Sequence, residues 1–414
     1  MGSVADVLLA FIFVYPIASA AVWVAGGLLF RILDERDEVE PPPGGWPGVT
    51  LLIPAYNEEP VIATCVRAAL AADYPELELL VLDDGSTDRT ADVATEAGGG
   101  DARFEVVRDE ANVGKAERLN LGLRRAGHDL VATTDADTHL HPHALKLLVS
   151  RMAQAHRIGA VAGGPHVTNR GTLLEAMQVM EAASIIGLIR RTQSVSGCVG
   201  TVAGVLGLFR REAVLEAGGY DRRIATEDID LTWRLLLAGW HTAYEPRALV
   251  GMQVPSTLHA LWAQRKRWAL GQGEVLRRHF GTVMRWRNRR LWLLAIESSA
   301  SLLWVMALAL SLIASGLALL TGAGVGIFGF SLAWGIAISV IATMQLAFAL
   351  RIDFPYDRRA AIAFVIGPLY PIAYWTISAA AALRCETVGL LRGPSKRHVT
   401  WDIPRARSDV ESGV

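Results

Sequence analysis

Four long apolar stretches constrain this chain more than any other feature. Each is longer than the roughly 20 residues that an α-helix needs to cross the hydrocarbon core of a bilayer. A long segment of mixed polarity separates the first stretch from the other three, so the sequence predicts a membrane protein with one large folded domain. The stretches cover residues 7–30, 291–320, 327–350 and 360–383.

Composition agrees with a folded domain joined to membrane segments, because 52% of the 414 residues are hydrophobic while 20% are charged. A formal net charge of −1 gives no reason to expect nucleic acid as a partner. The three cysteines, Cys65, Cys198 and Cys385, lie far apart, without a CxxC pair or a His/Cys cluster. They indicate neither a zinc site nor a disulfide framework.

The first apolar stretch is expected to be an uncleaved anchor. Residues 18–20 resemble a signal-peptidase site, but no basic region precedes the stretch and it continues well past that point. Arg31 and the basic loop 351–359 are expected to face the cytoplasm, because basic residues collect on that side. Four spans would then leave the basic tail 385–414 outside, so either the tail is exported or the number of spans is wrong by one.

This pattern divides the chain into six segments and predicts a multi-pass protein whose middle domain is cytoplasmic. Glu297 lies inside the first span after that domain, where it is either functional or reaches the headgroups. The segments are an anchor (1–33), a linker rich in proline (34–48), a cytoplasmic domain (49–255), amphipathic interfacial helices (256–290), three transmembrane helices (291–384) and a polar tail (385–414).

Strands alternate with helices in the first half of the cytoplasmic domain. This alternation predicts an α/β fold with a mostly parallel, doubly wound sheet, in which ligands bind beyond the carboxyl ends of the strands. A polar motif follows each of three predicted strands, and Pro54, Tyr56 and Glu58 belong to the first of them. We therefore expect one ligand site at this edge. The predicted strands are 49–54, 77–82, 104–107 and 130–134.

Carboxylates dominate the second and third motifs. Asp84 follows an apolar strand and can accept a hydrogen bond from the N–H of a nucleotide base, or alternatively cap a helix. Asp135 and Asp137 flank one small residue at a strand end. Mg²⁺ commonly uses one or two such carboxylates together with substrate phosphates, so the pair is a candidate metal site; a polar turn is the alternative.

Three acidic residues open a predicted helix over 229–238. The helix dipole favours acids in a first turn, but three of them within four positions exceed what stability needs. Transfer of a group to a hydroxyl requires a base, and Asp228 is the candidate. Glu227 and Asp230 are expected to orient the helix or its neighbours, with Glu227 close to the acceptor.

A basic, aromatic motif follows near residue 264. Gln264, Arg267 and Trp268 share one helical face, and Arg265 belongs to the same motif. An arginine can bind a diphosphate through two parallel hydrogen bonds, and a tryptophan can stack on a sugar ring, so the motif is a candidate clamp for diphosphate and acceptor. The alternative is an amphipathic helix on the membrane surface, and both descriptions can hold together.

Three further features are less specific. Lys115 precedes a predicted helix and either meets a phosphate or sugar or is a solvated lysine. His139, His141 and His143 alternate around a proline, which indicates an exposed turn rather than a metal cluster. Residues 194–207 are rich in Gly, Ser and Val, which predicts a closely packed floor, such as one beneath an acceptor.

Together these motifs resemble the processive, membrane-bound family 2 glycosyltransferases, which include cellulose, hyaluronan and chitin-type synthases. The likeness is strongest to members that make a β-1,6-linked N-acetylglucosamine exopolysaccharide. It covers roughly residues 49–280. The residues that carry it are 184–193, 209–211, 226–230, 244–249 and 264–269.

The resemblance implies a GT-A-like domain, a UDP-sugar donor such as UDP-N-acetylglucosamine, a Mg²⁺ or Mn²⁺ ion and inverting transfer to a growing polysaccharide. By this likeness, Asp84 binds the uridine, Asp137 binds the metal with Asp135 near the diphosphate or ribose, and Asp228 is the base. Gln264, Arg267 and Trp268 hold the diphosphate and the acceptor end. The implied location is a bacterial inner or plasma membrane, with room for a small membrane partner subunit.

Two features depart from the pattern of the family and would fit a different product. The sequence has only one N-terminal span where some relatives have two, and residues 201–204 lack the serine expected beside the acceptor. A non-processive enzyme that glycosylates a lipid phosphate is one rival, against which the motif at 264–268 argues. A haloacid-dehalogenase-like phosphatase is another, since residues 135–138 fit its DxDxT pattern. That rival leaves Asp84 unexplained.

Overall fold

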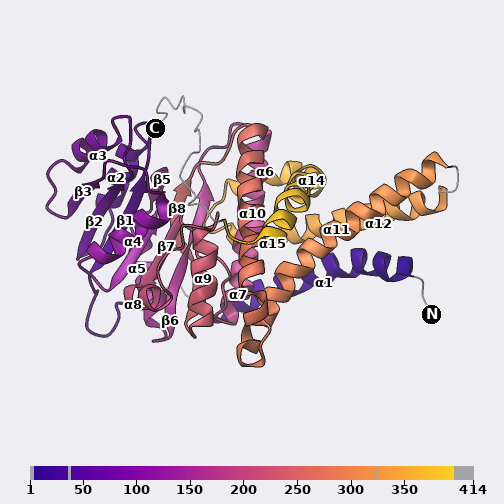
Figure 1. Ribbon diagram of the computed structural model, residues 1–414, viewed down its shortest axis with the longest axis horizontal. Helices are drawn as coiled ribbons and strands as arrows, with labels where there is room; N and C mark the ends of the chain where they lie inside the picture. Colours follow the sequence, from indigo (N-terminus) through magenta and orange to yellow (C-terminus); the bar gives the residue numbers. More distant parts are fainter. Residues whose placement is uncertain (1–3, 36–38, 322–324, 396–414) are drawn as a thin grey trace. The chain divides into compact units, whose positions relative to one another are not determined.

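The computed structural model describes residues 4–35, 39–321 and 325–395, and the chain forms two compact units (Figure 1). Among these described residues, the sheet unit comprises 39–168, 201–253 and Ser395, and the helical unit comprises 4–35, 169–200, 254–321 and 325–394. The domain predicted over 49–255 is therefore interrupted, because residues 169–200 belong with the helices.

The sheet unit is built on eight strands in the order β3-β2-β1-β4-β7-β6-β8-β5. Strands β1 to β4 pair in parallel, as do β6 and β8, whereas β7 runs antiparallel to β4 and β6, and β5 runs antiparallel to β8. The four predicted strands match β1 to β4 within two residues. The bounds are β1 Val49–Ala55, β2 Leu77–Asp83, β3 Phe104–Arg108, β4 Leu130–Thr134, β5 Thr138–Leu140, β6 Ile158–Val167, β7 Leu206–Arg210 and β8 His241–Met252.

Helices cover both faces of the parallel half, which explains why β1, β2 and β4 are almost continuously apolar. Leu51 and Ile53 join one buried cluster, whereas Leu52 and Leu82 meet α4 at Gly122, where a Cβ would lie 2.7 Å from Leu82. Glycine therefore lets α4 approach the sheet. The helices of this unit are α2 Ile62–Leu70, α3 Thr90–Gly98, α4 Lys115–Arg125, α5 Ala144–Ala153, α8 Arg211–Glu216 and α9 Glu227–Leu237.

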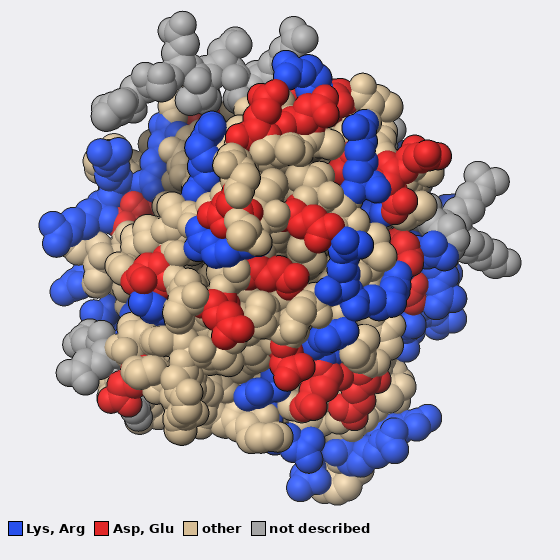
Figure 2. All heavy atoms as spheres, turned by 90° about the vertical axis from the view of Figure 1, so that its left-hand side faces the viewer, with Lys and Arg blue, Asp and Glu red and all other residues tan. Residues whose placement is uncertain are grey.

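Acidic and basic side chains are interspersed over the face of the sheet unit that carries α3 and β3 (Figure 2). Exposed ion pairs such as Arg89–Glu96, at 3.4 Å, contribute to this mixture. Pairs of this kind add little to stability. The mixed surface agrees with the formal net charge of −1.

In the described residues of the helical unit, three helices are long and apolar enough to cross a membrane: α1 (Val4–Leu33), α11 (Trp292–Leu320) and α12 (Val325–Asp353). Helices α1 and α11 are antiparallel, because Trp23 Nε1 donates to Glu297 Oε1 (2.9 Å) and Trp304 Nε1 donates to the Ile12 carbonyl (2.8 Å). The C-terminal ends of α1 and α12 meet where Arg31 donates to the Ile352 carbonyl (3.0 Å).

Shorter helices complete the helical unit. Helix α10 runs across the direction of α11 and α12 (Figure 1) and leads through a 3-10 turn, η2, into α11. The bounds are α6 Leu173–Glu181, η1 Ala182–Gly187, α7 Leu188–Val195, α10 Leu258–Val283, η2 Trp286–Leu291, α13 Ala360–Ala363, η3 Phe364–Leu369, η4 Tyr370–Tyr374, α14 Trp375–Ala381, η5 Ala382–Glu386 and α15 Thr387–Arg392.

The fourth predicted span, 360–383, is not one continuous helix. It is divided into short α, 3-10 and π segments, and its longest apolar helix covers only Ala360–Leu369. Pro368 and Pro371 lie within it and have no N–H to give to a regular helix. Beyond α15 the chain returns to the sheet unit, where the Ser395 N–H donates to the Arg223 carbonyl (3.0 Å). Three long apolar helices, rather than the expected four, are therefore present in the described part of the chain.

Candidate active site

Two of the predicted polar motifs are joined directly at the carboxyl edge of the sheet. The Asn57 N–H donates to Ser86 Oγ (3.0 Å), and Asn57 Oδ1 accepts from the Thr87 N–H (2.9 Å). Asn57 adopts φ +55°, a left-handed conformation that asparagine tolerates better than most residues. Tyr56 is half-buried beside it and Glu58 is only 2% exposed, and their contact with a donor stays a prediction.

Asp84 is completely buried and organises the loop that leads into α4. Its Oδ1 accepts from Arg118 Nε (2.6 Å) and from the Val113 N–H (2.9 Å), while Oδ2 accepts from the Gly114 N–H (2.8 Å). The carboxylate therefore has a structural role in this loop, and its contact with a nucleotide base stays a prediction. Arg118 was not identified from the sequence as the partner of Asp84. The only indication in the sequence is that Arg118 lies one helical turn after Lys115.

Lys115 is the first residue of α4 and links three parts of the site. Its Nζ lies 2.5 Å from Asp135 Oδ1 and 3.7 Å from Glu227 Oε1. Burial alone lowers the pKa of Lys115, but the Asp135 and Glu227 carboxylates outweigh burial and raise it. The lysine is therefore a fixed cation at the sheet edge rather than a solvated side chain.

Asp228 lies in the first turn of α9, where it faces a glycine loop. Its Oδ2 accepts from the Gly204 N–H (3.4 Å) and its Oδ1 from the Ile229 N–H (2.9 Å). A Cβ at Gly204 would lie 2.6 Å from Lys115 Nζ, so any larger residue would displace the lysine ammonium from this position. The small-residue signal in 194–207 included Gly204 without distinguishing it from its neighbours.

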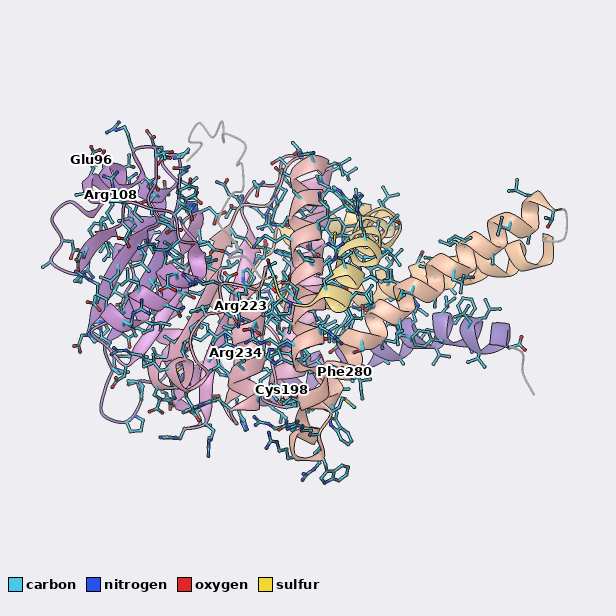
Figure 3. The ribbon with its side chains drawn as sticks, in the orientation of Figure 1. Glu96, Arg108, Cys198, Arg223, Arg234 and Phe280 are labelled. Atoms are coloured by element: carbon cyan, nitrogen blue, oxygen red, sulfur yellow. The ribbon has the colours of Figure 1, made fainter. Side chains whose placement is uncertain are left out.

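Residues predicted on the donor side and on the acceptor side line the same narrow crevice. Pro54 and Lys115, expected on the donor side, line it together with Glu227 and Asp228, expected on the acceptor side. The neighbouring Asp230 is fully buried and pairs at 2.7 Å with Nε of Arg234, one turn later in α9. Arg234 is labelled in Figure 3. A base candidate and a fixed cation thus share one small space.

Asp135 and Asp137 follow β4 and are half-buried. The Asp135 carbonyl accepts from Thr138 Oγ1 (2.7 Å) and from the Cys65 thiol (3.5 Å), whose pKa burial raises to about 12. This support holds the turn while leaving both carboxylates partly accessible.

The carboxylate pair suits a hard divalent cation that also takes oxygen ligands from a substrate. The described residues contain no group of three or more His, Cys, Asp or Glu side chains that could hold a metal by themselves. Water and phosphate oxygens would complete the coordination. Of the alternating histidines, His143 faces Asp73 instead (Nδ1–Oδ2, 3.3 Å).

The predicted clamp lies on α10, in the helical unit. Arg265 is buried and binds both Glu181 oxygens (2.8 and 2.6 Å) and the Tyr374 hydroxyl (2.6 Å). Arg265 therefore ties α10 to α6 and η4, and its place in a clamp stays a prediction. Gln264 and Arg267 are half-buried and Trp268 is 36% exposed, and their contact with a substrate stays a prediction.

Glu297 does not reach toward headgroups. Its carboxylate accepts from Trp23 Nε1 (2.9 Å) and from Gln193 Nε2 (3.3 Å), so it joins α11 to α1 and α7. Gln193 Oε1 in turn accepts from the Gly200 N–H (2.9 Å). This internal network favours a role within the helical unit over contact with lipid.

Comparisons with known proteins agree with this geometry. Residues 47–271 match the family model described as glycosyltransferase like family 2. The chain is 33% identical to the poly-β-1,6-N-acetyl-D-glucosamine synthase of Staphylococcus epidermidis, over 95% of this chain and 97% of that protein. The synthase of Staphylococcus aureus strain COL gives the same identity and the same coverage.

A solved structure also matches along most of its length. It is a mannosyltransferase from Pyrobaculum calidifontis in complex with GDP-mannose and Mn²⁺, with a TM-score of 0.63 and 22% identity. The match covers 92% of this chain and 99% of that one. It confirms the predicted fold class, a GT-A-like α/β sheet accompanied by long apolar helices.

Proposed function

The chain belongs to the family 2 glycosyltransferases, and from that premise we propose that it transfers N-acetylglucosamine from UDP-N-acetylglucosamine to a growing β-1,6-linked polymer. The family and the enzyme class agree with the prediction from sequence motifs, and they exclude the phosphatase alternative. The staphylococcal synthases, similar over 95% of this chain, support the choice of sugar and linkage. The observation that carries the chemistry is the crevice shared by Asp228 and Lys115.

On the donor side, Asp135 and Asp137 would hold Mg²⁺ or Mn²⁺ together with the diphosphate of the donor. Such an ion, when bound, supplies positive charge that stabilises the departing UDP. Lys115, already fixed against Asp135, adds a second positive charge at the same edge. Pro54 and Tyr56, on the loop after β1, would border the nucleotide.

On the acceptor side, Asp228 would act as the base. Its oxygens are held by the Gly204 and Ile229 N–H groups, so the carboxylate has a fixed direction. As the acceptor oxygen forms a bond to the anomeric carbon, the bond from that carbon to the phosphate oxygen breaks, and the hydroxyl proton passes to Asp228. One in-line attack inverts the configuration and requires no enzyme nucleophile.

We further propose that α1, α11 and α12 cross the membrane and that the sheet unit is cytoplasmic. With three spans, the N-terminus lies outside and the tail returns to the cytoplasm, as the hydrogen bond between Ser395 and Arg223 in the sheet unit supports. The part of the tail after Ser395 lies outside the described residues. Gln264, Arg267 and Trp268 would hold the acceptor end, so that the polymer moves outward by one sugar in each cycle.

Release of UDP by the purified full chain tests this proposal. We expect turnover with Mg²⁺ or Mn²⁺ to be selective for UDP-N-acetylglucosamine over UDP-glucose and UDP-glucuronate. Preference for another donor would retain the family and reject the product. A product that stops at one sugar on a lipid phosphate would reject processive synthesis in favour of lipid glycosylation.

A further inference from the structure

The turn between α10 and α11 concentrates positive charge and exposed aromatic surface. Residues 285–290 contain four arginines, all of them exposed, and the Trp286 side chain is 70% exposed. Asn288 leaves the helical conformation (φ −103°, ψ 18°), and its side chain donates to the Thr282 carbonyl (2.8 Å). The turn is thus a defined structure in the helical unit, just beyond Phe280 on α10 (Figure 3).

This turn lies at the end of the three long apolar helices. It leads directly into α11, and α1 and α12 end at the same level, as the bond from Arg31 to the Ile352 carbonyl indicates. The rings of Trp286 and Trp292 pack edge to face, with centroids 5.3 Å apart. Tryptophan is favoured at the depth of lipid headgroups, so the turn has the composition expected of a membrane interface.

Three acidic residues at this end of the helices are already paired with other arginines. Glu35 and Asp353 bind the buried Arg191 (3.3 and 2.7 Å), and Asp357 binds Arg170 (2.9 Å). By contrast, no ion pair in the described part of the chain involves the arginines at 285, 287 or 289. The turn therefore keeps a net positive charge.

We propose that Arg285, Arg287 and Arg289, together with Trp286, bind the headgroups of anionic phospholipids. Guanidinium groups suit phosphate oxygens, and Arg289 also lies over the Trp286 ring (5.7 Å), which keeps both side chains on one surface. This contact would fix the turn and the following span at the correct depth. The inference rests on the membrane placement proposed above, but not on the sugar or the linkage.

The proposal can be tested with the full chain in neutral detergent, titrated with fluorescent phosphatidylglycerol or with phosphatidylcholine carrying the same label. We expect wild type to prefer phosphatidylglycerol. Replacing the three arginines with glutamine (R285Q/R287Q/R289Q) should weaken that binding about 100-fold, because each basic residue near an anionic surface contributes roughly a factor of five. Raising the salt concentration to about 0.5 M should weaken wild-type binding in the same direction.

Two matched variants distinguish lipid binding by this turn from an effect of total charge and from an effect of misfolding. R89Q/R124Q/R125Q removes the same charge from exposed arginines of the sheet unit that already face glutamates, and it should bind like wild type. R285K/R287K/R289K keeps the charge and should retain most of the binding even if the glutamine variant folds poorly. Equal affinity for both lipids, or equal losses in the two glutamine variants, would overturn the proposal.

Discussion

Substitution of Asp84 by asparagine separates two roles that the sequence and the structure give to this residue. Sequence resemblance assigns it to the uridine, whereas the structure uses its carboxylate to hold Arg118 and the loop before α4. Both partners are buried, with side chains 0% and 3% exposed. Asparagine removes the charge and turns an N–H donor toward a backbone N–H.

The expected cost follows from this burial. Removing one partner of a buried ion pair typically costs about 3–5 kcal/mol. Arg118 keeps a second carboxylate, Asp109, whose side chain is 52% exposed, so we expect about 3 kcal/mol. For a unit of this size, that corresponds to an apparent melting temperature roughly 6–12 °C lower.

The assay is thermal unfolding of the full chain in detergent, with KM for the donor measured on the same samples. Asp84→Asn and Arg118→Met should each destabilise, and the double variant should cost at least about 1 kcal/mol less than the sum, because the two residues interact directly. A variant that melts like wild type and changes only KM for the donor would refute this reasoning and restore direct contact with the base.

Three further predictions concern the crevice and the helical unit. Lys115→Met should lower kcat about 100-fold or more in UDP-release assays, since it removes a fixed charge from the leaving-group side; near-normal kcat would exclude that role. Gly204→Ala should reduce activity strongly while circular dichroism stays unchanged, because its Cβ would meet Lys115 Nζ; full activity would contradict the close approach. Burial raises the pKa of Glu386 to about 7, so ionisation opposes folding and stability should fall as pH rises from about 4.5 to 7. The free energy of unfolding should fall by at most about 3 kcal/mol over this range. Glu386→Gln should abolish this fall in melting curves measured from about pH 4.5 to 7, and an unchanged pH dependence would contradict the assignment to Glu386.

The strands and their polar ends could be predicted because their signals are local. Each strand is an apolar run followed by a turn motif, and parallel strands bring such ends to one edge. Pro54 at the end of β1 accordingly lies in the crevice, whereas the meeting of Lys115 with Glu227 and Asp228, from distant parts of the chain, was not predicted.

Other features depend on contacts that no local pattern reveals. Arg265 looks like a ligand in its motif, yet Glu181 and Tyr374, 84 and 109 residues away in sequence, occupy its guanidinium. Asp84 is likewise used by backbone N–H groups about 30 residues later. Average hydropathy over 360–383 predicted a span because it ignores where the helix is interrupted.

The central claim is that Asp228 is the base of an N-acetylglucosamine polymerase. The most direct measurement incubates wild type and Asp228→Asn with UDP-N-acetylglucosamine and Mg²⁺ or Mn²⁺, then digests the insoluble product with a β-1,6-N-acetylglucosaminidase. We expect digestible polymer from wild type and none from the variant, while both bind the donor similarly. Polymer synthesis by the variant, or a wild-type product that resists the enzyme, would contradict it.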